Sequence, residues 1–206
     1  MDTAANKRVC DILEKVKSTF AFNGFDGASM QDLAQAAQMS VGNFYRYFPS
    51  KNAIITALVE RDLGEIEAVF ETVRAASDPG PVFMELLKRR IETLPVEDAA
   101  LWTEVQAAAF RSPEIGALMC SMEETVRRNV VGALIRIHAD DSESAIEDYT
   151  TRAHFLMILV HGFAEQKFCA RNTASPGQIS ALSELVLATL RKTIFTPPVS
   201  ASQRPD

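Results

Sequence analysis

The sequence SMQDLAQAAQMSVGNFYRYFPSK, residues 29–51, decides the fold and points most directly to the function. It predicts two short helices joined by a tight turn at Gln38, followed at once by the start of a third helix. Ser29 is placed to cap the first helix, with Asp32 three residues later as in a capping box, and Ser40 is placed to cap the second. Helices this short bury little surface alone. The pattern therefore predicts a helix-turn-helix braced by neighbouring helices.

Four stretches stand in the order and spacing typical of one known DNA-binding domain. They are FAFNGFDG (20–27), LAQAA (33–37), MSVGNFY (39–45) and YFPSKNAI (47–54). Together they resemble the TetR (tetracycline repressor) family over residues 7–58, and their order without gaps makes the match specific. One departure is Gln38, which stands where the family usually has a glycine in left-handed conformation, at a cost of about 1 kcal/mol.

The rest of the chain predicts an all-α fold of about nine helices. Apolar residues keep helical spacing in each segment, and there is no strand pair or βαβ alternation. We expect a three-helix DNA-binding domain in residues 1–50, joined by a long fourth helix to a helical regulatory domain for effector binding and dimerisation in residues 51–195. Residues 196–206 are expected to be a disordered tail. The helix order also matches the plan of the TetR family, although beyond residue 58 that resemblance rests on helix number and length.

The net charge of −6 looks unsuited to DNA until it is divided along the chain. The first 56 residues carry six basic and five acidic side chains, a net charge of +1, whereas the remainder carries 15 basic and 22 acidic side chains, a net charge of −7. The acid therefore lies outside the helix-turn-helix, where it favours solubility and keeps DNA from the wrong face. A chain of 206 residues with 47% hydrophobic residues is also long enough for a substantial core.

Cysteine usage and hydropathy predict a cytoplasmic protein that does not bind membranes. Cys10, Cys120 and Cys169 are widely spaced and odd in number, which fits a reduced compartment, and each is expected to be a small buried hydrophobic residue rather than a redox sensor. The N-terminus is polar and carries no signal-peptide pattern. The most apolar run, around residues 155–160, is too short to span a bilayer.

Candidate DNA contacts follow from the resemblance and from the chemistry of the second short helix. Asn43 can both donate and accept, as an adenine edge requires, and Tyr45 resembles the family's tyrosine that contacts phosphate or base. Lys51 lies at a helix start, where its ammonium and the free backbone N–H groups would together bind a phosphate. The alternative is that it is an ordinary solvated lysine. Val41 fits base contact and core packing equally well. The predicted DNA-binding residues are Ser29, Met30, Gln31, Ser40, Val41, Gly42, Asn43, Tyr45, Arg46 and Lys51.

Candidate effector contacts in the second domain are mainly apolar, aromatic and thioether side chains, with Gln106 and His161 as polar groups that orient the ligand, although the apolar residues could instead form core. They are Leu87, Trp102, Gln106, Phe110, Met119, Met122, Phe155 and His161. Such a lining predicts a mainly hydrophobic small molecule, because no cluster of cations or glycine-rich helix start is present for phosphate. His154 and His161 share a helix face, but a metal would need further ligands. We therefore expect no metal and no cofactor.

The last two helices carry more apolar surface than one small domain needs. They are expected to pair with their mates in a second copy as an isologous four-helix interface. The predicted dimer-interface residues are Phe155, Ile158, Gly162, Phe163, Leu182, Leu185, Val186, Thr189 and Leu190.

No arrangement of residues typical of a catalytic site is present: there is no Gly-x-Ser-x-Gly, phosphate loop or His-Glu-x-x-His. We therefore expect no enzymatic activity. The leading hypothesis is a ligand-responsive transcriptional regulator, a repressor rather than an activator, that binds a palindromic operator in double-stranded DNA as a homodimer and is released by a small hydrophobic effector. The alternative is an all-helical binding or enzymatic protein with an incidental helix-turn-helix-like segment.

Overall fold

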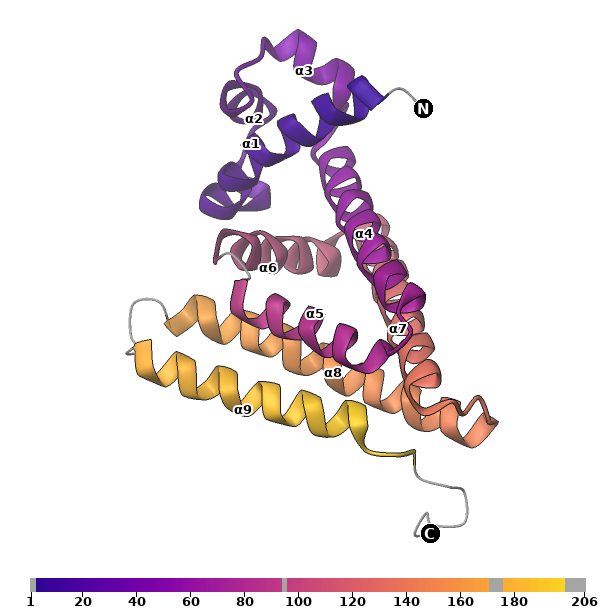
Figure 1. Cartoon of the computed structure of the whole chain (residues 1–206). Coiled ribbons are helices and arrows are strands. Elements are labelled where there is room, and N and C mark those ends of the chain that lie inside the picture. Colours follow the sequence, from indigo (N-terminus) through magenta and orange to yellow (C-terminus); the bar gives the residue numbers. More distant parts are fainter. Residues whose placement is uncertain (1–2, 94–95, 171–175, 199–206) are drawn as a thin grey trace. The chain divides into compact units, whose positions relative to one another are not determined.

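The computed structural model describes residues 3–93, 96–170 and 176–198, and this part of the chain forms helices without any strand (Figure 1). The helices are α1 (Thr3–Gly27), α2 (Met30–Ala36), α3 (Val41–Tyr47), α4 (Lys51–Ala75), α5 (Pro79–Thr93), α6 (Val96–Arg111), α7 (Pro113–His138), α8 (Glu143–Ala170) and α9 (Pro176–Phe195). The all-α prediction is confirmed. The expected tail falls mostly outside the described residues.

The chain divides into two compact units. Unit 1 comprises Met1–Gly64 and Pro95–Met122, and unit 2 comprises Glu65–Leu94 and Glu123–Asp206. Unit 1 thus contains the helix-turn-helix together with α6 and the first part of α7. The functional division at residues 50 and 51 expected from the sequence stays a prediction.

The core of unit 1 explains why its two shortest helices are stable. Leu33 of α2 and Phe44 of α3 are completely buried against Ile12, Val16 and Phe20 of α1. Full burial of such a side chain contributes about 1.5–3 kcal/mol, whereas an isolated helix of seven residues is unstable in water. Packing against α1 therefore holds α2 and α3.

Local hydrogen bonds set the ends of these helices. The Ser29 hydroxyl oxygen accepts from the Asp32 N–H at 3.1 Å, and the Ser29 N–H donates to Asp32 Oδ2 at 2.9 Å, which confirms the predicted capping box. Ser40 caps α3 by accepting from the Asn43 N–H. Between the helices Gln38 has a φ of 58°, so the turn keeps the left-handed conformation without glycine.

Replacing Ser29 by alanine is expected to lower the free energy of unfolding by about 1 kcal/mol at neutral pH. The difference between the two proteins should shrink in acid, because the Ser29 hydroxyl and backbone N–H hold the pKa of Asp32 below its ordinary value. A carboxylate with a lowered folded pKa adds stability above its unfolded pKa, about pH 4, and that stability is lost as the pH falls through the folded pKa. Denaturation series at neutral and acidic pH test this. An equal difference at both would exclude the Asp32 carboxylate as the cause.

Unit 2 is built mainly from α5, α8 and α9, which run side by side (Figure 1), together with parts of α4 and α7. Its core includes Phe83, Tyr149 and Leu190, all buried. Two arginines close helix ends in this unit. Arg136 donates to backbone carbonyls at the C-terminal end of α4, and Arg152 does so at the end of α9. These bonds satisfy carbonyls that a helix end leaves free.

Two helix boundaries and the three cysteines show local detail of the fold. Pro79 begins α5, a position where a missing N–H costs nothing, so only residues 76–78 separate α4 from α5. Helix α1 has a kink at Gly24, with a φ of 72°, and continues to Gly27. The three cysteines, expected to be buried, are all exposed because they lie on outward faces of their helices. Within the described residues, no helix is both long and apolar enough to cross a bilayer.

Candidate nucleic-acid interface

Helix α3 turns one side to the core and the other to solvent. Phe44 is completely buried, and its ring packs against that of Phe48 with 5.7 Å between the ring centroids. Residues 41–43 and 45–47 are all exposed. The two phenylalanines, four residues apart, thus anchor α3 and leave its remaining residues free to contact a ligand.

The first turn of α3 is open. Val41 is 40% exposed, so its alternative interpretation as a core residue is wrong. The reason is its place at the first position of the helix, one turn before the anchor Phe44. A Cβ at Gly42 would meet no atom within 4 Å. This end of α3 is therefore unobstructed, as a helix that enters a DNA groove requires.

The polar side chains of α3 have no partners within the described part of the chain. The Asn43 amide, the Tyr45 hydroxyl and the Arg46 guanidinium form no hydrogen bond or ion pair there, and Tyr45 is 46% exposed. An amide can pair with an adenine edge, and hydroxyl and guanidinium groups suit phosphates. All three groups are thus available for an external partner.

Lys51 differs from these residues because the protein already engages its ammonium. Lys51 Nζ donates to the carbonyl oxygens of Phe25 at 2.7 Å and Asp26 at 3.2 Å, and lies 4.9 Å from the centroid of the Phe25 ring. The side chain thereby ties the start of α4 to the end of α1. One of its three N–H groups remains for a phosphate, so the proposed phosphate contact is compatible with a structural role. The alternative of an ordinary solvated lysine does not describe it.

Replacing Lys51 by alanine is expected to lower the free energy of unfolding by about 1–3 kcal/mol, because two charge-assisted hydrogen bonds are lost. Thermal and chemical denaturation of Lys51→Ala and Arg46→Ala measure this, with Arg46 as the matched cation that has no partner among the residues described. Equal stability of the two variants would mean that the carbonyl contacts contribute nothing. Any loss of DNA binding by Lys51→Ala must accordingly be compared at a temperature where both variants are folded.

The remaining predicted DNA contacts differ in their exposure and in the hydrogen bonds that they already form. Gln31 is exposed on α2, whereas Met30 is half-buried against the core of unit 1. Ser29 and Ser40 are exposed, but both hydroxyls serve as helix caps. Their contact with DNA stays a prediction.

Two further residues near this surface were missed or left open by sequence reasoning. Lys15 of α1 donates to Gln38 Oε1 at 3.3 Å, which places a cation at the turn between α2 and α3. Its only signal in the sequence is an outward position on α1. Tyr47 of α3, which is not among the predicted DNA contacts, is 39% exposed.

The predicted effector contacts do not gather in one unit. Trp102, Met119 and Met122 are half-buried against the core of unit 1, while Phe110 is 93% exposed. Gln106 is exposed in unit 1, and Leu87, Phe155 and His161 belong to unit 2. Desolvation lowers the pKa of His161, although its side chain is exposed at the surface of unit 2. A single pocket formed by this set stays a prediction.

The predicted dimer contacts divide by exposure. Ile158 and Leu185 are 67% and 65% exposed, and Phe155 is exposed as well. Phe163, Val186 and Leu190 are buried in the core of unit 2. These three are therefore corrected from interface to core residues, because helical spacing alone does not tell which apolar side of a helix faces its own chain. Gly162 is exposed, and Leu182 and Thr189 are half-buried.

Helices α2 and α3, joined by a tight turn and packed against α1, form a helix-turn-helix DNA-binding domain. Residues 12–58 match the family model for bacterial regulatory proteins of the tetR family. The HTH-type transcriptional regulator UidR of Escherichia coli (strain K12) is 29% identical over 130 residues, 61% of this chain and 64% of UidR. The HTH-type transcriptional repressor KstR of Mycolicibacterium smegmatis is 29% identical over 129 residues, 58% of this chain and 62% of KstR. This chain thus spans less than two thirds of the length of these relatives.

Most of the chain also has a counterpart among solved structures. Salmonella enterica GusR superposes with a TM-score of 0.69 and 23% sequence identity, covering 90% of this chain and 96% of GusR. That likeness concerns the fold alone, whereas the family model matches the sequence of residues 12–58 directly. Over residues 12–58 the chain thus matches the tetR family of bacterial regulatory proteins, and its relatives include HTH-type transcriptional regulators.

Proposed function

We propose that this protein is a DNA-binding transcriptional repressor that binds a palindromic operator as a homodimer and releases it on binding a small hydrophobic effector. The observation that carries the proposal is the exposed first turn of α3, where Asn43, Tyr45 and Arg46 have no partner among the described residues. Repression is supported by the name of the relative KstR. The proposed location is the cytoplasm, where the DNA is.

Fluorescence anisotropy with a labelled duplex from the region upstream of the protein's own gene tests DNA binding. The proposal expects saturable binding that an unlabelled specific duplex displaces and a random duplex does not. Affinity should fall steeply with salt concentration, because phosphate contacts release counterions. Weak association that moderate salt abolishes equally for every duplex would favour the alternative, an all-helical protein with an incidental helix-turn-helix-like segment.

Homodimerisation is supported by the apolar side chains that α8 and α9 leave open. Ile158 and Leu185 are each about two thirds exposed, which is unusual for large apolar residues unless a partner covers them. A two-fold axis would bring the same patch of both copies together. A dimer would also match the symmetry of a palindromic operator.

An aspartate at Leu185 is therefore expected to convert the dimer into a folded monomer. Burying an unpaired carboxylate in an apolar interface costs several kcal/mol. Light scattering coupled to gel filtration measures the mass, and circular dichroism checks that helicity is kept. Val69→Asp, at an exposed apolar residue of α4, is the matched control and should remain dimeric. A wild-type protein that is already monomeric at micromolar concentration would contradict the proposal.

The effector part of the proposal rests on the aromatic and thioether side chains singled out in the sequence. Release of DNA requires only that the effector bind better to a conformation of the dimer that binds DNA poorly. A thermal-shift screen should find stabilisation by apolar compounds that also weaken DNA binding. Stabilisation by phosphorylated metabolites alone would overturn the expected chemistry.

A further inference from the structure

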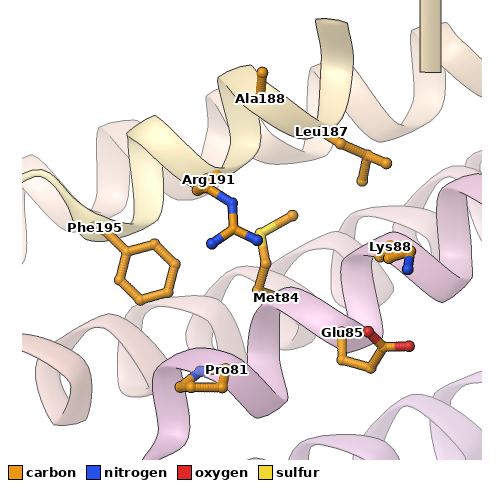
Figure 2. A pocket seen from close by; sticks show the side chains of 8 residues that line it. All are labelled: Pro81, Met84, Glu85, Lys88, Leu187, Ala188, Arg191 and Phe195. Atoms are coloured by element: carbon orange, nitrogen blue, oxygen red, sulfur yellow. The ribbon is translucent and has the colours of Figure 1, made fainter. Parts of the chain in front are cut away.

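A groove of about 410 Å³ lies between α5 and α9 in unit 2 (Figure 2). Both helices belong to unit 2 and pack directly against each other. The volume falls within the range of about 300–1,000 Å³ typical of small-molecule sites. None of the residues that line this groove is among the predicted effector contacts, so the groove is a separate feature of the molecule.

The groove has an apolar part supplied by both helices. Met84 comes from α5, and Leu187 and Phe195 come from α9. The Phe195 ring lies directly on α5, since a Cβ added at Gly80 would stand 2.7 Å from Phe195 Cε1. The absence of a side chain at Gly80 thus lets the aromatic ring close one end of the groove.

Charged side chains line the groove as well. Lys88 and Arg191 bring two positive charges from opposite helices, and Glu85 brings one negative charge. None of the three forms an ion pair or hydrogen bond within the described residues, and Figure 2 shows all three among the lining side chains. The groove therefore has a net charge of +1 and an unpaired guanidinium beside apolar surface.

Helical spacing produces this combination. Leu187, Arg191 and Phe195 follow at intervals of four along α9, and Met84 and Lys88 do so along α5. Residues four apart share a helix face. Each helix thus presents a cation next to apolar groups on the side that faces the other.

We propose that this groove binds an amphipathic monoanion, a carboxylate joined to an aromatic or branched aliphatic group. The planar guanidinium of Arg191 can hold a carboxylate through two parallel hydrogen bonds, and Lys88 adds a second positive charge. Met84, Leu187 and Phe195 take the apolar part of the ligand. Glu85 opposes a second negative charge, so phosphate esters and dicarboxylates bind worse. This site goes beyond the proposed function and does not depend on it.

Isothermal titration calorimetry with 4-phenylbutyrate tests the proposal on the full-length protein. The uncharged 4-phenylbutanamide keeps the shape of the probe and removes its charge. We expect saturable binding of the acid, and at least about tenfold weaker binding of the amide or of the acid to Arg191→Gln. Glu85→Gln should tighten binding of the acid, because it removes the only negative charge among the described residues that line the groove.

The matched control is Lys192→Gln, which removes one positive charge from the neighbouring exposed position of α9 outside the groove. It should leave the affinity for the acid unchanged. Perturbation of the Met84 methyl resonance by the acid would locate the binding, and in Arg191→Gln it should require at least about tenfold more acid. Equal binding of acid and amide, an equal loss in Lys192→Gln, or no saturable binding of the acid would each overturn the proposal.

Discussion

Replacing Phe44 by alanine is expected to lower the free energy of unfolding of unit 1 by about 3–5 kcal/mol, the range for large aromatic side chains removed from a core. Phe44 is completely buried and contacts the ring of Phe48, and α3 has only seven residues. The helix therefore has little stability of its own to offset the loss. We expect α3 to be displaced in the variant, and DNA binding to be lost with it.

Chemical denaturation followed by circular dichroism measures the effect on Phe44→Ala. Tyr45→Ala is the matched control, since it removes a neighbouring aromatic residue whose side chain is nearly half exposed. The control should stay within about 0.5 kcal/mol of the wild-type stability. A loss below about 1 kcal/mol in Phe44→Ala would mean that Phe48 and α1 hold α3 without it.

Local chemistry made the helix-turn-helix predictable. Ser29 and Asp32 stand three residues apart and bond each other, so their role depends only on neighbouring residues. The same holds for Ser40, which caps α3. At Gln38 the surrounding helices impose a left-handed φ that the residue itself does not favour. The free-energy cost of this conformation is small compared with the stabilisation that burial of Leu33 and Phe44 contributes nearby.

The sequence alone did not predict contacts between residues that are far apart in the chain. Glu104 of α6 accepts a hydrogen bond from the Phe25 N–H at 3.0 Å, and Asp98 pairs with Lys17 at 3.1 Å, across 79 and 81 residues of chain. No local pattern relates such residues, so the inclusion of α6 in unit 1 could not be foreseen. The structural role of Lys51 was not foreseen for a related reason, since its carbonyl partners lie 25 and 26 residues earlier.

The sequence showed which residues of a helix are apolar, but not whether an apolar residue faces the core of its own chain or a partner. Leu185 and Val186 are adjacent apolar residues of α9, yet Leu185 is exposed and Val186 is buried. Both fit the apolar pattern, because a wide apolar stripe does not tell which of its residues face the core of the same chain. The same ambiguity explains why Phe163 was assigned to the interface and lies in the core.

Replacing Asn43 or Tyr45 by alanine is expected to weaken operator binding in two different ways. Asn43→Ala should cost about 1–3 kcal/mol on the preferred duplex and relax the choice of base at one position, if its free amide reads a base edge. Tyr45→Ala should weaken binding to all duplexes equally, because a phosphate contact carries no sequence information. Anisotropy titrations against the operator and single-base variants measure both effects.

Arg46→Ala completes this comparison, because it removes a charge where the other two variants do not. It should reduce the slope of affinity against salt by about one phosphate, whereas Asn43→Ala and Tyr45→Ala should leave the slope unchanged. Asn23→Ala, an exposed asparagine on α1 in the same unit, is the control and should bind as the wild type does. Wild-type affinity, specificity and salt slope in all three α3 variants would place the DNA-binding surface elsewhere, because the side chains that α3 leaves unpaired would then have no role in it.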